Sequence, residues 1–405
     1  MDFTPTEEQE AARELAGRIF ADLAGHERLR AAGTGTDAEL WKALCAAGLP
    51  GSVEETGLLG LVLLLEEQGR TTAQVPFAAS CVYGILAVAR HGTEEQRARL
   101  LPGLRDGTTV LTGALPAPGT VTVAWGTATA ARGTATAAPG TVTAAPDTAT
   151  ATATAPPGTA TAPPGWVTPT PDTVTPPPGT VTAPGAGWLS GAVAWVPWLR
   201  DATHVLVPDQ DRVLWLVRTE DAAAVEPVEL TAPWAAARLV LDGAPAERLG
   251  RSDATAHDDV LTAARIAFAG LQAGVCAGSL DRAVAHTSVR EQFGRPLSTR
   301  QAVQLRAADA HMDTEAIRVT AYEAAWRFDE GLDAGGAALT AAWWASEAGR
   351  RVVHAGQHLH GGTGADLDHP VHRHFLWGRQ LDAYLGAGTE LLAELGDLLA
   401  KGDPS

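Results

Sequence analysis

The chain has 405 residues, of which 45% are hydrophobic and 19% are charged, a composition typical of a globular protein large enough for two or three domains. Its formal net charge of −17 excludes the broad basic surface that neutralises nucleic-acid phosphates. The three cysteines, Cys45, Cys81 and Cys276, are too few and too far apart for a secreted disulfide framework. The N-terminus is acidic rather than basic, and no uncharged apolar run reaches membrane-spanning length. We therefore expect a soluble cytoplasmic protein with neither a nucleic-acid partner nor a membrane span.

Residues 1–114 have the pattern of an N-terminal helical domain. Thr6 is placed to cap a helix whose first turn holds several glutamates, as the positive end of a helix dipole favours. Leu15, Ile19 and Leu23 then recur at intervals of four residues, which gives the helix one apolar face. Further helices are predicted at 38–47, 58–68, 77–90 and 94–104.

The segment 115–187 differs abruptly in composition and consists mostly of Thr, Ala, Pro, Gly and Val. Gly-Thr or Asp-Thr recurs every seven residues from 119 to 147, and the same period resumes from 158 to 179. A period of seven can indicate a coiled coil, but the spaced prolines exclude a continuous helix and the repeat has no Leu or Ile for a seam. We predict a flexible insertion produced by duplication of a short unit, rather than a dedicated binding element.

Residues 188–250 form the remainder of a small middle β domain, because short apolar runs are separated there by turn residues. These runs lie at 202–207, 213–217 and 237–241. Helical periodicity returns in 251–405, interrupted by loops. The order helix, strand, helix indicates an α+β protein that is mainly α.

The first motif with chemical content is a Gly/Pro turn between two predicted helices. It reads Arg290-Glu291-Gln292-Phe293-Gly294-Arg295-Pro296-Leu297 and is followed by Gln301. Taken alone, the turn is a basic corner whose arginines are solvated.

The second motif is a glycine loop after a helix that carries His354 and His358. It reads His360-Gly361-Gly362-Thr363-Gly364. Paired glycines let the backbone approach a ligand closely and expose N–H groups that suit a pyrophosphate. His354 and His358 share a helix face and raise a zinc alternative, but Ala355 stands where a zinc hydrolase would need Glu, and a third ligand would also be required. We therefore predict no metal site.

Taken together, the two motifs resemble the acyl-CoA dehydrogenase family. The family carries an Arg-x-x-Phe-Gly-x-x-Leu turn, a Gln eight residues after its Phe and a later Gly-Gly-x-Gly loop. The matching residues are Arg290, Phe293, Gly294, Leu297, Gln301, Gly361, Gly362 and Gly364. Met1-Asp2-Phe3 and the stretch 66–70 are also similar, so that the resemblance covers about residues 1–114 and 188–400. It implies an N-terminal helical domain, a small middle β domain and a C-terminal four-helix bundle, assembled as a tetramer.

The resemblance also implies FAD as the cofactor, an acyl-CoA as the substrate and an electron-transfer flavoprotein as the acceptor. It assigns eight residues to FAD, namely Arg290, Gln292, Phe293, Gln301, His358, Gly361, Gly362 and Thr389. The residues of the turn would reach the diphosphate and adenine side of FAD, whereas Gln301 and the glycine loop would contact it from the neighbouring subunit. We expect the hydrogen bond from Arg290 to phosphate to contribute most, because it is charge-assisted.

The catalytic base of the family is missing from both of its usual positions. In the family a Glu carboxylate removes the α-proton of the acyl-CoA while hydride leaves the β-carbon for the flavin. The position two residues before Thr389 is Ala387, and the alternative position before Arg265 is Ala264. Glu390 could act as the base only if the loop were displaced, and we expect it to be an exposed carboxylate at a helix N-terminus. The segment 113–118 also departs from the Ala-x-Thr-Glu-Pro-like stretch that contacts the flavin ring in the family.

The stretch 358–377 is similar to actinobacterial acyl-CoA dehydrogenases of steroid and related catabolism, which often assemble as α2β2 heterotetramers with one base-lacking subunit type. The first hypothesis is such a subunit, which shares FAD with a homologous catalytic partner that oxidises an acyl-CoA to the trans-2-enoyl-CoA. The second is a self-sufficient homotetramer that uses Glu390 or another carboxylate. The third is a non-enzymatic, degenerate member of the family. The sequence favours them in that order.

Overall fold

The computed structural model describes residues 3–115, 121–124 and 186–402, so that most of the predicted insertion at 115–187 lies outside the described residues. Its elements follow the predicted order of a helical domain, a β domain and a second helical domain. The predicted fold class is therefore confirmed.

The N-terminal domain begins with a helix that is capped as the sequence predicts. The hydroxyl of Thr6 accepts a hydrogen bond from the N–H of Gln9 at 3.3 Å, and the Gln9 side chain accepts one from the N–H of Thr6 at 2.9 Å. This reciprocal capping box satisfies two N–H groups that the helix itself cannot pair. The helical elements of the domain are α1 (Glu7–Leu23), α2 (His26–Ala32), α3 (Ala38–Ala46), α4 (Leu49–Thr71), α5 (Phe77–Ala79), the π-helical segment η1 (Ser80–Leu86), α6 (Ala87–His91) and α7 (Glu94–Asp106).

Helix α4 is longer than the predicted segment 58–68 because it continues across a break at Gly57. Gly57 has a φ of 72°, a left-handed conformation that glycine adopts without steric cost. Asp329, from the C-terminal domain, accepts hydrogen bonds from the N–H groups of Leu58 and Leu59 at 2.8 and 2.9 Å. A distant carboxylate thus caps the second part of α4, in the way that a local Asp would cap an ordinary helix.

The β domain is a seven-stranded sheet in the order β1-β4-β5-β7-β3-β2, with β6 paired to β7. Its side chains alternate between two cores, as the strand period of two requires. Leu214 and Leu216 join the core shared with the helices, whereas Trp215 and Val217 join the core on the other face. The strands are β1 (Leu111–Gly113), β2 (Val121–Ala124), β3 (Ala186–Val196), β4 (His204–Pro208), β5 (Leu214–Arg218), β6 (Ala224–Pro227) and β7 (Ala237–Leu249). The sheet thus includes β1 and β2, which precede the range 188–250 expected for this domain.

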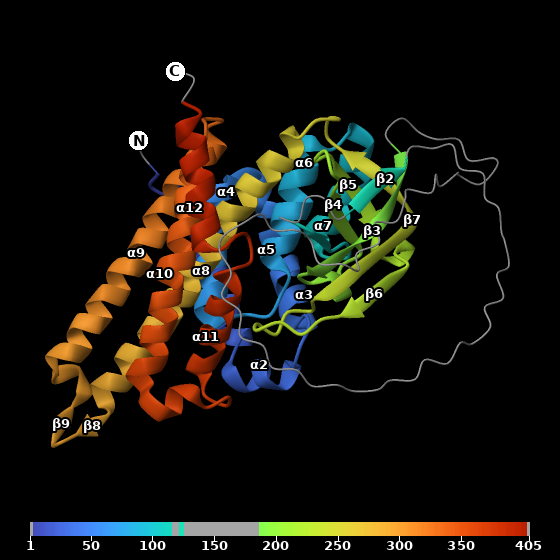
Figure 1. Ribbon diagram of the computed structural model, residues 1–405. Helices are drawn as coiled ribbons and strands as arrows, with labels where there is room; N and C mark the ends of the chain where they lie inside the picture. The colour runs from blue at the N-terminus through green and yellow to red at the C-terminus, as the bar shows by residue number, and fades with distance from the viewer. Residues whose placement is uncertain (1–2, 116–120, 125–185, 403–405) are drawn as a thin grey trace, which may run out of the picture.

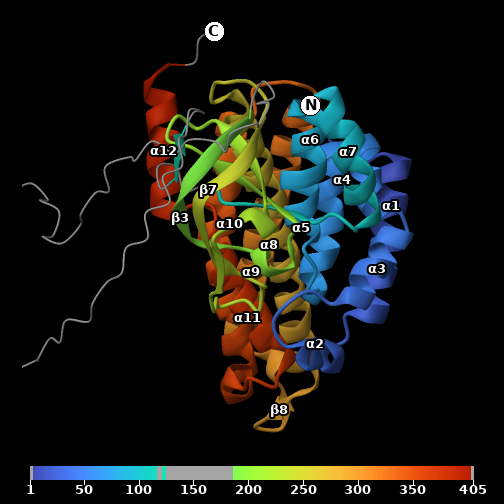
Figure 2. The ribbon, with the colours of Figure 1, turned by 90° about the vertical axis from the view of Figure 1, so that its right-hand side faces the viewer.

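The C-terminal domain is built on three long helices, with α11 and α12 packed against α10. Its elements are α8 (Thr255–Val289), β8 (Glu291–Gln292), β9 (Arg295–Pro296), the 3-10 turn η4 (Leu297–Thr299), α9 (Gln301–Asp329), α10 (Gly335–His360), the 3-10 turn η5 (Gly361–Ala365), α11 (Pro370–Leu381) and α12 (Gly388–Ala400). In Figure 1 the long helices stand to the left of the sheet, and Figure 2 shows the sheet in front of them. Helix α8 is long and apolar enough to cross a membrane, but most of it is buried inside the protein.

Helices α4 and α8 touch along a glycine seam, formed by Gly69 of α4 and by Gly270, Gly274 and Gly278 of α8. The three glycines of α8 recur every four residues and therefore share one helix face. A Cβ atom added at Gly274 would lie 2.1 Å from the carbonyl oxygen of Glu66, and one added at Gly278 would lie 2.3 Å from that of Arg70. Because no side chain fits between the two backbones, the seam holds the N-terminal domain directly against the bundle.

We expect Gly274→Ala to destabilise the protein, because the new methyl group must push the backbone of α4 away. Overpacking of this kind typically costs about 1–3 kcal/mol. The matched control is Gly396→Ala in α12, where the added Cβ meets no atom within 4 Å and where Ala is favoured over Gly by up to about 1 kcal/mol. Chemical denaturation of both variants measures the difference. Equal free energies of unfolding would mean that the seam relaxes without cost.

Candidate functional site

The first motif lies at the free end of the bundle, in the β8–β9 hairpin (Figure 1). Phe293 has a left-handed φ of 54°, and its side chain is 91% exposed. The guanidinium of Arg300 lies 5.2 Å from the centre of the Phe293 ring and donates a hydrogen bond to the carbonyl of Gln292 at 3.0 Å. The hairpin therefore presents a flat aromatic ring and cationic groups to the outside in a defined conformation, which suits a planar anionic ligand.

The glycine loop lies at the same end of the molecule. The ring of His286, near the end of α8, stacks on His360, the last residue of α10, with 4.7 Å between their centres. Gly361 follows with a φ of 65°, and neither it nor Gly362 has any atom within 4 Å of an added Cβ. Open backbone of this kind is accessible to the phosphates of a ligand.

Two other predicted FAD residues lie close to this end. Gln301 is the exposed first residue of α9. His358 lines a cavity of about 680 Å³ between α9 and α10, together with His354. His354 packs edge-on against the ring of Phe375 at 4.9 Å. Within the described ranges, no group of three or more His, Cys, Asp or Glu side chains is arranged to hold a metal ion.

Thr389 and the two base positions lie in a different part of the molecule. Ala264 is 25 residues before the end of α8 at Val289, which corresponds to about 38 Å along the helix axis. Ala387 directly precedes α12, and Thr389 lies in its first turn. The structure therefore places the two motifs predicted to bind FAD at the same end of one chain, but it separates them from Thr389 and from the base positions.

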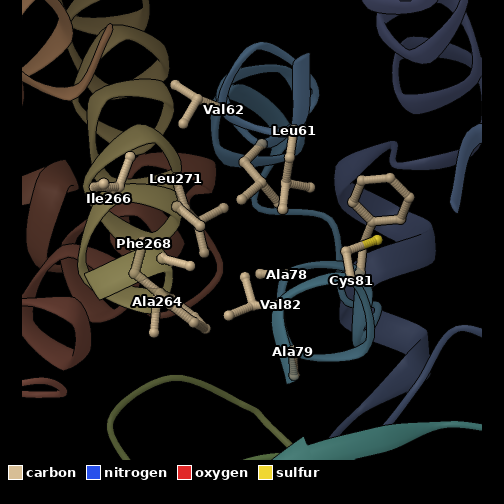
Figure 3. Close-up of a cluster of buried hydrophobic side chains, with 14 of the residues drawn as sticks. Leu61, Val62, Ala78, Ala79, Cys81, Val82, Ala264, Ile266, Phe268 and Leu271 are labelled. Carbon is tan, nitrogen blue, oxygen red and sulfur yellow. The ribbon is translucent and has the colours of Figure 1, made fainter. Parts of the chain in front are cut away.

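The surroundings of Ala264 are apolar and closed. Ala264 is fully buried and belongs to a cluster with Phe268 from the same helix, Val62 from α4 and Val82 from η1 (Figure 3). The ring of Phe268 packs edge-on against Tyr384 at 4.8 Å. None of the side chains labelled around the alanine in Figure 3 is a carboxylate.

Two buried tyrosines border this cluster. The hydroxyl groups of Tyr83 and Tyr384 lie 2.8 Å apart. Burial raises the pKa of Tyr83 and that of Tyr384 far above the ordinary value of a phenol. Both tyrosines are therefore protonated at neutral pH and do not replace the missing carboxylate.

The carboxylates at the start of α12 are occupied by other contacts. The side chain of Glu390 accepts a hydrogen bond from the N–H of Ala387 at 3.0 Å, which caps α12. Glu394 accepts two hydrogen bonds from the guanidinium of Arg265, at 2.8 and 2.6 Å. The sequence analysis missed this ion pair and the tyrosine pair, because their members are 129 and 301 residues apart and no local pattern links them.

The motif end of the bundle fits the FAD that the resemblance implies. An arginine can pair with the diphosphate, an exposed aromatic ring can stack on a planar group, and open glycine backbone offers N–H donors. The segment 113–118, expected near the flavin ring, lies partly outside the described residues.

Comparison with known proteins gives two family matches. The acyl-CoA dehydrogenase N-terminal domain matches residues 6–108, and the acyl-CoA dehydrogenase C-terminal domain matches residues 255–394. The acyl-CoA dehydrogenase FadE27 of Mycobacterium tuberculosis is 30% identical, over 99% of each chain.

Two solved structures are similar over nearly the whole chain. The Tcur3481–Tcur3483 steroid ACAD is 38% identical with a TM-score of 0.79, over 98% of this chain and 99% of that chain. The ChsE4–ChsE5 complex from Mycobacterium tuberculosis is 28% identical with a TM-score of 0.80, over 100% of both chains.

The apolar closure around Ala264 can be tested with Ala264→Glu and its uncharged control Ala264→Gln. Both variants add similar volume to a packed core, which we expect to cost about 1–3 kcal/mol or more. Only the Glu variant buries an ionisable group, whose pKa would be raised, so its stability should fall further as the pH rises through that pKa. Chemical denaturation of both variants from about pH 4 to about pH 8 measures the difference between their free energies of unfolding at each pH. A difference that does not change with pH would show that the position is open to water.

Proposed function

Because this chain belongs to the acyl-CoA dehydrogenase family, whose members are FAD-dependent oxidoreductases that act on CH–CH bonds, we propose that it is the base-lacking subunit of a heteromeric acyl-CoA dehydrogenase. A homologous subunit provides the catalytic base. The assembly, an α2β2 tetramer in the cytoplasm, oxidises an acyl-CoA to the trans-2-enoyl-CoA and passes electrons to an electron-transfer flavoprotein.

One observation carries this proposal: the chain has both family motifs at one open end of the bundle, which we call the cofactor-binding end, and has no carboxylate at either base position. Bound FAD would supply the acceptor for the hydride that leaves the β-carbon of the substrate. The α-proton needs a base of suitable pKa within hydrogen-bonding reach. Ala264 and Ala387 offer none, so the proton goes to the partner. Arg290, Gln292, Phe293, Gln301, His358, Gly361, Gly362 and Thr389 remain the residues that we assign to FAD.

An exposed apolar stripe supports association with another helical subunit. Leu305, Met312 and Val319 recur every seven residues on α9 and are 56%, 69% and 48% exposed. Apolar residues at this spacing are typical of a helix that packs lengthwise against another helix, and exposed apolar surface of this kind marks an interaction site. The stripe begins close to the cofactor-binding end, where a neighbouring subunit would have to reach the same FAD.

The structural relatives support a heteromer and a bulky substrate. Two of them are named as a steroid ACAD and as a two-component complex, and this chain resembles both over nearly its full length. We therefore infer that the acyl group is a steroid side chain or a group of similar bulk.

The proposal predicts that flavin is retained only when the chain is co-expressed with a homologue that carries Glu at a base position. The visible absorption spectrum of the lone chain and of the complex measures this directly. In the complex, Arg290→Ala should lower flavin affinity about tenfold or more, since a charge-assisted hydrogen bond is lost. The control is Arg251→Ala, which removes an exposed arginine that is paired with Asp253.

The other outcomes of this experiment decide between the alternatives. Flavin with turnover in the lone chain would establish the self-sufficient homotetramer. Absence of flavin from both preparations would contradict both enzymatic hypotheses and favour the third, a degenerate, non-enzymatic member of the family.

A second prediction concerns Glu390. Glu390→Ala should leave turnover by the complex unchanged and should destabilise α12 by about 0.5–2 kcal/mol, because the cap is lost. Glu390→Gln keeps an acceptor oxygen and should retain most of that stability. Steady-state kinetics of the three proteins provide the test. A fall in kcat of about 10²–10⁴, the usual contribution of a general base, in both variants would make Glu390 the base and contradict the proposal.

A further inference from the structure

A second cavity, of about 540 Å³, lies where the N-terminal domain, the loop 227–234 and α11 meet. Its charged lining is mainly positive, with three arginines, Arg30, Arg200 and Arg373, and one carboxylate, Glu229. This cationic cavity, as we call it, contains none of the residues assigned to FAD. It stands out in a chain whose net charge is −17.

Arg373 is held rigidly but by neutral groups only. Its Nε donates to the hydroxyl of Thr72 at 3.3 Å, and its Nη2 donates to the carbonyl of Thr72 at 3.2 Å and to the side-chain oxygen of Gln74 at 3.1 Å. Gln74 is itself fully buried, and its amide nitrogen donates to the carbonyls of Gly33 and Gly35 at 2.9 and 2.6 Å. The guanidinium is thus fixed in place before any ligand arrives.

No carboxylate of the described chain pairs with Arg373. Burial lowers its pKa to about 10, so it remains charged at neutral pH. Removing a charged group from water without a counter-charge is costly. Its Nη1 makes no hydrogen bond within the described residues, which leaves the N–H groups of this nitrogen free for a charge-assisted hydrogen bond to an oxyanion.

The rest of the cavity offers further donors and an apolar wall. The indole N–H of Trp234, a residue only 2% exposed, has no hydrogen-bond partner among the described residues. The guanidinium of Arg200 donates a hydrogen bond to the hydroxyl of Thr34 at 3.4 Å, whereas that of Arg30 is paired with Asp368 at 2.9 Å. Guanidinium and indole nitrogens donate hydrogen bonds and accept none, so an acceptor-rich ligand is required. Leu376 belongs to the apolar part of the lining.

We propose that the cationic cavity binds an organic anion, with its phosphate or carboxylate group on Arg373 and an apolar body against Trp234 and Leu376. The site is separate from the FAD site of the proposed function and does not depend on it. Two histidines, His26 and His372, also line the cavity.

Calorimetric titration of the purified chain with phenyl phosphate, benzoate and inorganic phosphate tests the proposal. The first two probes carry the same apolar ring on different anionic groups, and the third is the anionic group alone. We expect at least one ring-bearing probe to bind more tightly than inorganic phosphate, and the better of the two identifies the preferred group. Absence of binding by all three would overturn the proposal.

Variants locate the binding site. Arg373→Met should weaken the better probe at least tenfold, whereas Arg379→Met, on the same helix but outside the cavity and paired with Asp382, should not. Arg200→Met removes an exposed arginine of the cavity lining and should weaken binding severalfold. This variant replaces Arg373→Met as the test if the Arg373 variant does not fold. Arg290→Ala should leave binding unchanged, which separates this site from the FAD site. Unchanged affinity in both the Arg373 and Arg200 variants would place the anion elsewhere.

Discussion

The direct backbone contact between α4 and α8 is the constraint on which the arrangement of the domains depends. With glycine at 270, 274 and 278 of α8, the two helices approach so closely that carbonyl oxygens of α4 occupy the space that Cβ atoms at Gly274 and Gly278 would need. Glu66, fully buried beside this seam, accepts hydrogen bonds from Nε of Arg318 on α9 at 3.0 and 3.2 Å. Burial raises the pKa of Glu66, and the arginine opposes the shift. The seam and this ion pair together join α4, α8 and α9.

Because α8 is one continuous helix, it also determines how far apart the functional parts of the chain lie. Its first half carries Ala264 and packs among the N-terminal helices, and its end carries Arg290 and the exposed hairpin. Because the helix is rigid, it keeps the surroundings of Ala264 and the exposed hairpin apart. This separation is consistent with the site shared between subunits that we propose, for which the stripe on α9 would provide a contact surface.

The two anion-binding regions that we propose differ in construction. The cofactor-binding end has exposed groups on a hairpin and an open glycine loop, and in our proposal another subunit would cover them. The cationic cavity instead holds Arg373 in place through Thr72 and Gln74 within one chain. An acidic protein can contain both, because net charge describes the whole surface whereas binding depends on the few charges within hydrogen-bonding distance.

Local patterns allowed much of the fold and part of the site to be predicted from the sequence. The cap at Thr6, the helix periods, the order of the domains, the hairpin motif and the two alanines at the base positions are each defined by residues a few positions apart. Caps, turns and helix faces are stabilised by neighbours in the chain, so spacing alone reveals them.

The tertiary structure alone decided the rest. Asp329 caps α4 across 271 residues, and Tyr83 meets Tyr384 across 301. The strands β1 and β2 join a sheet whose other strands begin at residue 186. Arg373 faces a cavity and pairs with no carboxylate of the described residues, which its position in a helix could not reveal. Which distant segments pack together determines the burial, the long-range hydrogen bonds and the pairing of charges. The periodicity of the sequence does not show which segments these are.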